Sequence, residues 1–258
     1  MPLHHLLIAL LAMLPLAAGD LAPTGTLRAS FLATNPVQGR VDPATKAVTG
    51  PVADLVKELA RRHQLPFELV PLPDAGAVIE SLKTHRVDIG FLAFERERAA
   101  QVDFSDPYAM MGNAYLVRSD SGITRSADVD RAGVTVGAVK GQSQEIFVSA
   151  NLKNARIEVM PDMPTAPVLT KLLVDRRIDV FAANRQRMTE IARTSSQLRV
   201  LADDFFVVGQ AVVVPKGERA RLEEINRFVA DVRRSGFMRQ SLDRAGLQVI
   251  QVAPDPAR

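Results

Sequence analysis

The sequence predicts an α/β fold in which two similar lobes share one chain. Between residues 26 and 93, segments typical of buried strands alternate with amphipathic segments, in a β-α-β-α-β order that favours a parallel sheet. One helix-strand unit then recurs, since Leu82–Ala93 (LKTHRVDIGFLA) and Leu173–Asn184 (LVDRRIDVFAAN) carry Leu, Arg, Asp and aliphatic residues at the same offsets. A repeated unit indicates lobes built alike, although chance similarity between two amphipathic units is the alternative for so short a match.

The composition limits the class of protein. Of the 258 residues, 47% are hydrophobic and 24% are charged, which is enough apolar material for one large or two modest cores. The net charge of +3 is spread along the chain and only 5% of residues are aromatic, so we expect no nucleic-acid partner. Because there is no Cys, the chain forms no disulfide and carries no lipid anchor on a cysteine.

The N-terminus is typical of an exported protein. Residues 6–18 form an apolar run that is too short to span a bilayer and is followed by small residues. We therefore expect residues 1–19 to be a signal peptide, cleaved after Gly19, and the mature protein to lie free in the periplasm. A buried helix is the alternative interpretation of this run.

The first half of the chain supplies three predicted strands and two helices. The first helix opens at Gly50-Pro51, with proline in its first turn, and the second is capped by Asp74. The strands are rich in Val, Ile, Leu and Phe and are expected at Thr26–Leu32, Phe67–Val70 and Val87–Ala93.

The second half is expected to repeat the alternation of strands and helices. After a charged turn at residues 94–98, an alternating stretch from Val102 is expected to stop at Pro107-Tyr108. A helix is predicted at Gln144–Val148, and two amphipathic helices separated by Ser235-Gly236 close the chain. Strands are predicted at Ala114–Val117, Val134–Val139 and Val207–Val214, and a basic helix is expected to follow Asn184 and run to Leu198–Leu201.

Candidate site residues follow the ends of these strands, where ligands of open α/β sheets collect. The candidates are Asn35 after the first strand, Phe94, Glu95 and Arg98 after the third, and Asn184 at the end of the repeated strand. The alternative for Glu95 is an ordinary solvated charge within the cluster of acidic and basic residues at 95–98.

A second set of candidates lies at a predicted helix start. Gln142 and Ser143 follow Gly141 and open a helix, where unpaired N–H groups and the helix dipole favour an anion. A simple helix cap is the alternative function for these two residues.

Several motifs resemble the family 3 extracellular solute-binding proteins that serve ABC importers of polar amino acids. The motifs are Gly50-x-x-x-Asp54-Leu55, Arg86-Val87-Asp88, and Glu97-Arg98 followed by VDFSDPY at 102–108, and the resemblance covers nearly all of the mature chain. It implies a type II periplasmic-binding-protein fold, with two lobes of mostly parallel sheet flanked by helices and joined by two hinge strands. Lobe 1 is expected at residues 20–114 and 212–258, lobe 2 at 118–208, and the hinges near 115–117 and 209–214.

The resemblance also assigns roles to individual residues. Arg98 matches the arginine that grips the α-carboxylate of the ligand, and Ser143 matches the helix start that donates to the same group. The chain departs from the family at Glu95, where a threonine is usual, at Ala93, and at Asn184, where an acidic residue usually holds the α-ammonium. Either Glu95 supplies the missing charge, or the ligand is an organic anion without an α-amine.

The resulting hypothesis is a monomeric, non-enzymatic binding protein that captures a small carboxylate-bearing solute for a separate ABC permease. Members of the family close like a hinge around the ligand, and the permease recognises the closed form. We expect no cofactor and no metal site, because His63 and His85 fall at helix ends apart from any ligand cluster. The alternatives are a periplasmic enzyme similar to cyclohexadienyl dehydratase, with Glu95 as its acid, and a ligand-sensing subunit for a membrane receptor.

Overall fold

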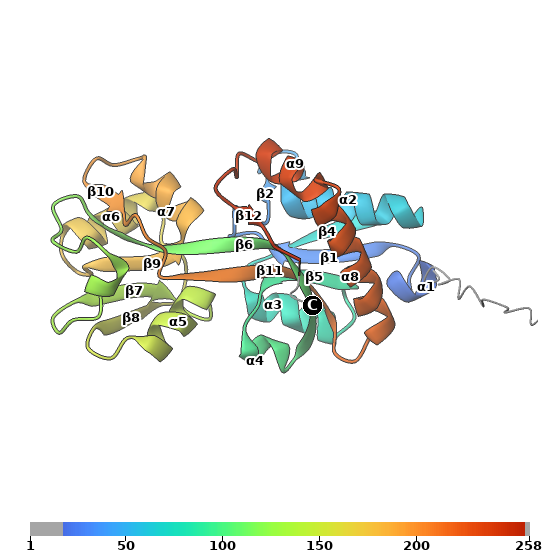
Figure 1. The fold of residues 1–258 in the computed structure, drawn as a ribbon, viewed down its shortest axis with the longest axis horizontal. Helices are drawn as coiled ribbons and strands as arrows, with labels where there is room; N and C mark the ends of the chain where they lie inside the picture. The colour runs from blue at the N-terminus through green and yellow to red at the C-terminus, as the bar shows by residue number, and fades with distance from the viewer. Residues whose placement is uncertain (1–17, 256–258) are drawn as a thin grey trace, which may run out of the picture.

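The computed structural model describes residues 18–255 as two lobes of α/β structure (Figure 1). The predicted signal peptide at residues 1–19 therefore lies outside the described residues, except for its last two positions. The elements of the first lobe and of the strand that leaves it are α1 (Ala18–Leu21), β1 (Leu27–Leu32), β2 (Arg40–Val41), β3 (Val48–Thr49), α2 (Pro51–His63), β4 (Phe67–Leu72), α3 (Ala75–Lys83), β5 (Ile89–Ala93), α4 (Arg96–Ala99) and β6 (Val102–Arg118).

The second lobe follows β6, and the C-terminal helices return to the first lobe (Figure 1). The remaining elements are a 3₁₀ turn (Ser126–Asp128), β7 (Thr135–Val139), α5 (Ser143–Asn151), β8 (Arg156–Met160), α6 (Ala166–Val174), β9 (Val180–Asn184), α7 (Arg185–Ala192), β10 (Leu198–Val200), β11 (Phe206–Pro215), α8 (Arg219–Arg234), α9 (Phe237–Arg244) and β12 (Gln251–Val252).

The strands form one path in the order β4-β1-β5-β11-β6-β9-β7-β8. In the first lobe β4, β1 and β5 are parallel, and in the second lobe β9, β7 and β8 are parallel, as the β-α-β order predicts. β11 lies antiparallel to both β5 and β6. Figure 1 shows β6 and β11 running from one lobe to the other, so the predicted two-lobed α/β fold is confirmed.

β6 changes partners where it crosses between the lobes. Its residues from Val102 to Asn113 pair with β11, and those from Asn113 to Val117 pair with β9. Tyr115 and Val117 pack in a second-lobe core with residues of β7 and β9. The positions of the hinges near 115–117 and 209–214 stay a prediction.

The predicted stop at Pro107-Tyr108 is wrong, because β6 continues through both residues. The register of β6 against β11 shifts here, since Gln210 pairs with Ala109 whereas Ala211 pairs with Pro107. Proline has no N–H to donate to a ladder and is tolerated in a strand at such an irregularity. Tyr108 is fully buried in the first-lobe core, where its ring meets Phe91 edge-on.

The sequence repeat corresponds to the same backbone design in each lobe. Its aligned residues His85 and Arg176 end their helices with positive φ angles of 52° and 56°. Asp88 and Asp179 then join their strands to a neighbouring strand in the same way. The Asp88 N–H donates to the Arg28 carbonyl and its carboxylate accepts from the Arg28 N–H, and Asp179 exchanges the same two bonds with Thr135.

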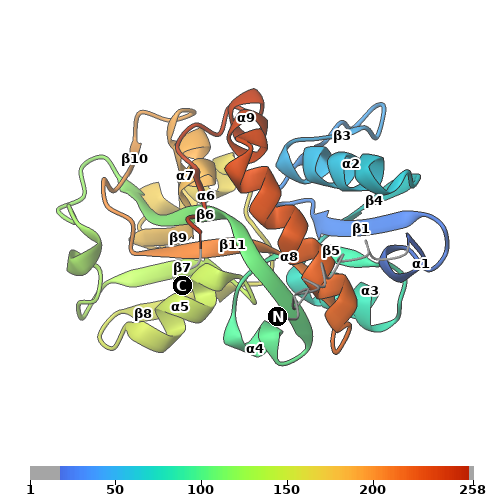
Figure 2. The same ribbon diagram turned by 45° about the vertical axis from the view of Figure 1, so that its right-hand side comes forward.

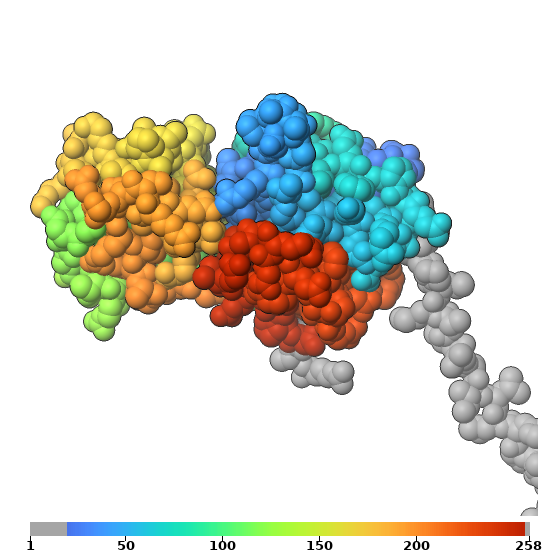
Figure 3. Space-filling model, turned by 90° about the horizontal axis from the view of Figure 1, so that it is seen from above, coloured from blue at the N-terminus to red at the C-terminus, as the bar shows by residue number. Residues whose placement is uncertain are grey.

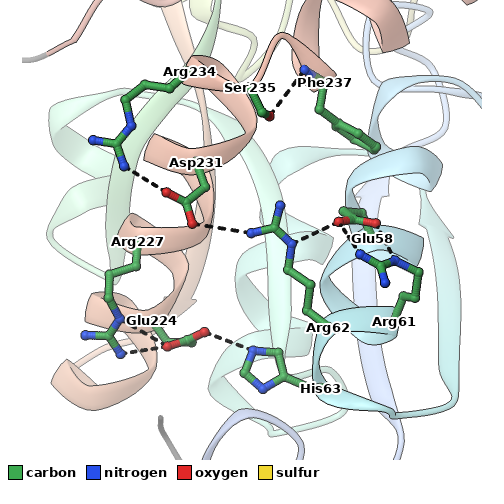
Figure 4. Close-up of polar contacts among 10 residues, drawn as sticks. All are labelled: Glu58, Arg61, Arg62, His63, Glu224, Arg227, Asp231, Arg234, Ser235 and Phe237. Atoms are coloured by element: carbon green, nitrogen blue, oxygen red, sulfur yellow. Dashed lines mark hydrogen bonds and ion pairs between the residues drawn. The ribbon is translucent and has the colours of Figure 1, made fainter. Parts of the chain in front are cut away.

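Helix α8 packs the C-terminal segment against the first lobe, and Figure 2 shows the helix lying across the strands of that lobe. Its apolar residues join the core that β1, β5 and α2 form. Charged residues link it to α2 at the surface (Figure 4). Arg62 on α2 contacts both Glu58 on its own helix and Asp231 on α8, and His63 contacts Glu224 at 2.9 Å. Within residues 18–255, no helix is both long and apolar enough to cross a membrane.

Candidate functional site

A cavity of about 420 Å³ lies between the two lobes. Figure 3 shows the molecule from above, with the yellow and orange surface of the second lobe meeting the blue and red surface of the first. Ala93 and Asn184, the last residues of β5 and β9, both line this cavity, so the ends of the repeated strands open onto the same space. The predicted site residues in its wall are Asn35, Arg98, Gln142, Ser143 and Asn184.

Arg98 enters the cavity from the short helix α4, directly after β5. Its side chain is only 6% exposed, and it donates from Nη1 to the Ala93 carbonyl at 3.0 Å and from Nη2 to the Gly141 carbonyl of the second lobe at 2.9 Å. These two bonds leave three of the five guanidinium N–H groups for another acceptor. Burial lowers the pKa of Arg98, while Glu95 and Glu97 oppose this shift.

The start of α5 faces Arg98 from the second lobe. Gly141 adopts a positive φ of 70°, a left-handed conformation that glycine takes without steric cost, and turns the chain from β7 into α5. Ser143 is 4% exposed, and the first N–H groups of α5 have no partner within the helix. An anion between Arg98 and this helix start therefore meets positive potential from both lobes.

Phe94 and Glu95 are absent from the wall of the cavity that Arg98 lines. Phe94 is 48% exposed and its ring meets Phe104 edge-on at 5.2 Å. Glu95 lies close to Arg98 and Ser143, and burial raises its pKa, while Ser143 and Arg98 oppose that shift. Glu95 therefore acts on the site through Arg98 and Ser143 in this structure.

Asn35 and Asn184 line the cavity from opposite lobes, and each uses its side-chain oxygen within the protein. Asn184 is the N-cap of α7, and its Oδ1 accepts from the Arg187 N–H at 2.8 Å. Asn35 forms a local turn in which Oδ1 accepts from the Val37 N–H at 3.1 Å. In each residue the NH₂ group and the second lone pair of Oδ1 are the parts of the amide left for a ligand.

Sequence reasoning missed three polar residues near the site. Gln144 and Asn113 are buried, and the side-chain Nε2 of Gln144 donates a hydrogen bond to the side-chain Oδ1 of Asn113. Arg187 follows the cap residue Asn184 by three positions and lines a small cavity that shares Asn35, Gln142 and Asn184 with the main one. The signal for Arg187 was its place in the first turn of a helix that begins at the end of β9.

Metal binding has no support in the described part of the chain. Between residues 18 and 255, no three or more His, Cys, Asp or Glu side chains are grouped so as to hold a metal ion.

Comparison with known proteins identifies the family. Residues 28–246 match the model of the bacterial extracellular solute-binding proteins, family 3. The chain belongs to this family. The resemblance predicted from the sequence motifs is therefore confirmed.

This solute-binding protein has relatives with different named activities. It is 27% identical over 195 residues to the L-cystine-binding protein TcyJ of Escherichia coli (strain K12), covering 74% of the chain and 71% of that protein. It is 25% identical over 197 residues to the cyclohexadienyl dehydratase of Pseudomonas aeruginosa, again covering 74% of the chain and 71% of the relative. A crystal structure of a mutant of ArgBP from T. maritima has the same fold, with a TM-score of 0.73 and 23% identity, covering 90% of this chain and 99% of that one.

Proposed function

We propose that the protein captures a small carboxylate-bearing solute between its lobes and presents it to an ABC importer. The observation that carries this proposal is the burial of the Arg98 guanidinium together with the kind of partners it has. Within residues 18–255 its hydrogen bonds go to two backbone carbonyls, although its guanidinium is almost fully buried. A buried cation is costly unless an anion pairs with it, so a ligand carboxylate would offset that cost.

The geometry of the site suits a carboxylate. The planar guanidinium offers parallel N–H donors that match the two oxygens of a carboxylate, and charge-assisted bonds of this kind are about twice as strong as neutral ones. The unpaired N–H groups at the start of α5 approach from the other lobe. A carboxylate held by both groups joins the lobes, which favours a closed form.

Two polar contacts already join the lobes. Arg98 of the first lobe bonds the Gly141 carbonyl of the second, and Arg40 on β2 pairs with Glu190 on α7 at 2.5 Å. In the proposed function the ligand adds to these contacts, and an inner-membrane permease recognises the closed protein. This function places the mature chain in the periplasm, where it acts as a monomer.

The test is a thermal-shift screen of the mature protein against amino acids and organic acids, with Arg98→Met and Arg98→Ala as variants. A ligand at a hundredfold excess over Kd stabilises the native state by about 2.7 kcal/mol. We expect both variants to lose the response to the best carboxylate ligand. Arg96→Met is the matched control, because Arg96 is an exposed residue of the same short helix. An unchanged response in the Arg98 variants would reject Arg98 as the carboxylate anchor.

A second candidate function is an enzyme of the cyclohexadienyl dehydratase type. It is favoured by the similarity to the Pseudomonas aeruginosa enzyme and by Glu95, whose raised pKa suits a carboxylic acid that assists a leaving hydroxyl group. Glu95 lies outside the cavity wall in this structure, so binding remains the leading proposal. Turnover of prephenate or arogenate by the purified protein, abolished in Glu95→Gln, would establish the enzyme instead.

A further inference from the structure

We propose that the solute is an organic dicarboxylate without an α-ammonium group, and that Arg187 binds its second carboxylate. This inference rests on the proposed function, since it takes Arg98 as the anchor of the first carboxylate. The inference depends on which hydrogen-bond donors and acceptors of the cavity wall have no partner within the protein.

The two asparagines of the wall oppose an α-ammonium. Both Oδ1 atoms already accept backbone N–H groups, Val37 N–H for Asn35 and Arg187 N–H for Asn184. Their NH₂ groups are donors that cannot pair with an ammonium, and the second lone pair that each Oδ1 keeps carries no negative charge to offset one. Asn184 is only 8% exposed, and an ammonium placed against it would lose water without gaining an opposite charge. The same NH₂ groups are suitable partners for carboxylate oxygens.

Arg187 supplies positive charge on this side of the cavity. Its Nε is buried and has no hydrogen-bond partner, and its side chain lines the small cavity that Asn35 and Asn184 also line. Within residues 18–255 we find no acidic side chain paired with its guanidinium, and only its backbone N–H is bonded, to Asn184. An unpaired, partly buried guanidinium next to two amide donors is a site for a second anion.

The other charged residues of the main cavity wall, Asp74, Lys140 and Asp162, do not line the small cavity. Asp74 caps α3 through a bond from the Ala77 N–H at 2.8 Å, and both Asp74 and Asp162 are exposed. Lys140 is also exposed. The small cavity that holds Arg187 has no carboxylate in its wall, so cationic groups face the second end of the ligand there.

The test uses isothermal titration calorimetry with three matched ligand series. The first contains dicarboxylates of three to six carbons, from malonate to adipate. The second contains monocarboxylates of the same carbon numbers, and the third contains the corresponding α-amino acids, such as L-aspartate for succinate. We expect the best dicarboxylate to bind at least tenfold more tightly than both of its counterparts, a difference of about 1.4 kcal/mol.

The variants assign the second carboxylate to a residue. Arg187→Met should reduce affinity for the best dicarboxylate to that of its monocarboxylate, while affinity for the monocarboxylate changes less than about twofold. Arg187→Lys should recover part of the preference, because it restores charge without the planar fork. Arg193→Met is the control, since Arg193 is an exposed residue at the end of the same helix and lies in neither cavity wall.

Each outcome decides the inference. An α-amino acid that binds more tightly than its dicarboxylate counterpart would overturn it, as would an Arg187→Met protein that keeps the full preference. Binding of monocarboxylates or amino acids with no advantage for any dicarboxylate would reject this inference and leave the proposed function standing. If no carboxylate binds at all, both proposals fail.

Discussion

At the scale of single residues, the function of a polar side chain depends on which of its atoms already have partners. Asn184 shows this, because as a sequence position it offers both a donor and an acceptor to a ligand. In the structure one lone pair of its oxygen caps α7, so the amide offers a ligand its NH₂ group and a single remaining lone pair. The same holds for Asn35, and together the two residues change the expected ligand chemistry more than their amino-acid type suggests.

Asn184→Asp should shift the ligand preference toward α-amino acids. One carboxylate oxygen can keep the bond from the Arg187 N–H, while the second brings a negative acceptor into the cavity. We expect the affinity ratio of an α-amino acid to its acid without the amine to rise at least tenfold, about 1.4 kcal/mol, in calorimetric titrations. A ratio equal to that of the unchanged protein would show that position 184 does not select for the amine.

At the scale of elements, the repeated aspartates predict unequal contributions to stability. Asp88 is 2% exposed and accepts from the Arg28 side chain as well as its N–H, whereas the Asp179 side chain is 32% exposed. We expect Asp88→Asn to lower the free energy of unfolding by about 2 kcal/mol. Asp179→Asn should lower it by less than about 1 kcal/mol, because its surroundings are solvated. Urea denaturation measures both values, and equal losses would contradict the prediction that the two aspartates contribute unequally to stability.

The ion pairs of Glu58 within α2 predict a pH-dependent contribution to stability. A hydrogen bond from Arg61, with further help from Arg62, lowers the pKa of Glu58 to about 2 (Figure 4). A carboxylate whose pKa is lower in the folded state than in the unfolded state stabilises the fold above the unfolded pKa. This contribution is therefore present above about pH 4.5 and is lost as the pH falls toward 2.

Glu58→Gln tests this contribution through unfolding free energies between pH 7 and pH 3. Because Arg61 is largely exposed, the variant should be less stable by no more than about 1 kcal/mol at pH 7. The difference should shrink below pH 4.5. Glu223→Gln, at an exposed position on α8, is the control. A difference that stays constant with pH would argue against the Glu58 ion pairs as its source.

At the scale of the whole molecule, closure depends on contacts between lobes that do not involve the ligand. Glu190 of α7 meets Arg40 of β2 at 2.5 Å, and the side chains are 29% and 58% exposed. Glu190→Gln should weaken binding of every ligand about two- to fivefold without changing their ranking, because exposed pairs contribute up to about 1 kcal/mol. Calorimetry at low salt and at about 1 M salt should show the difference disappear as salt screens the pair. A changed ranking would mean that Glu190 contacts the ligand.

The sequence by itself determined the fold class and the family, and it predicted Arg98 as the proposed carboxylate anchor. These depend on local patterns: strand and helix periodicity, the repeated unit ending in Ala93 and Asn184, and the motif around Arg98. The continuation of β6 through Pro107 did not follow from local pattern, since it requires β11, which lies about a hundred residues away, to accommodate the irregularity.

Only the tertiary structure decided what each site residue can offer a ligand. Phe94 and Glu95 lie beside Arg98 in sequence but outside the cavity wall, because the chain turns into α4 between them and Arg98. Arg187 reaches the wall of the small cavity only when α7 forms. The side-chain oxygens of Asn35 and Asn184 each accept one backbone N–H, through bonds that form only when the helices and turns are in place. The sequence tells which polar groups are present, whereas the tertiary structure determines which of their donors and acceptors remain without a partner.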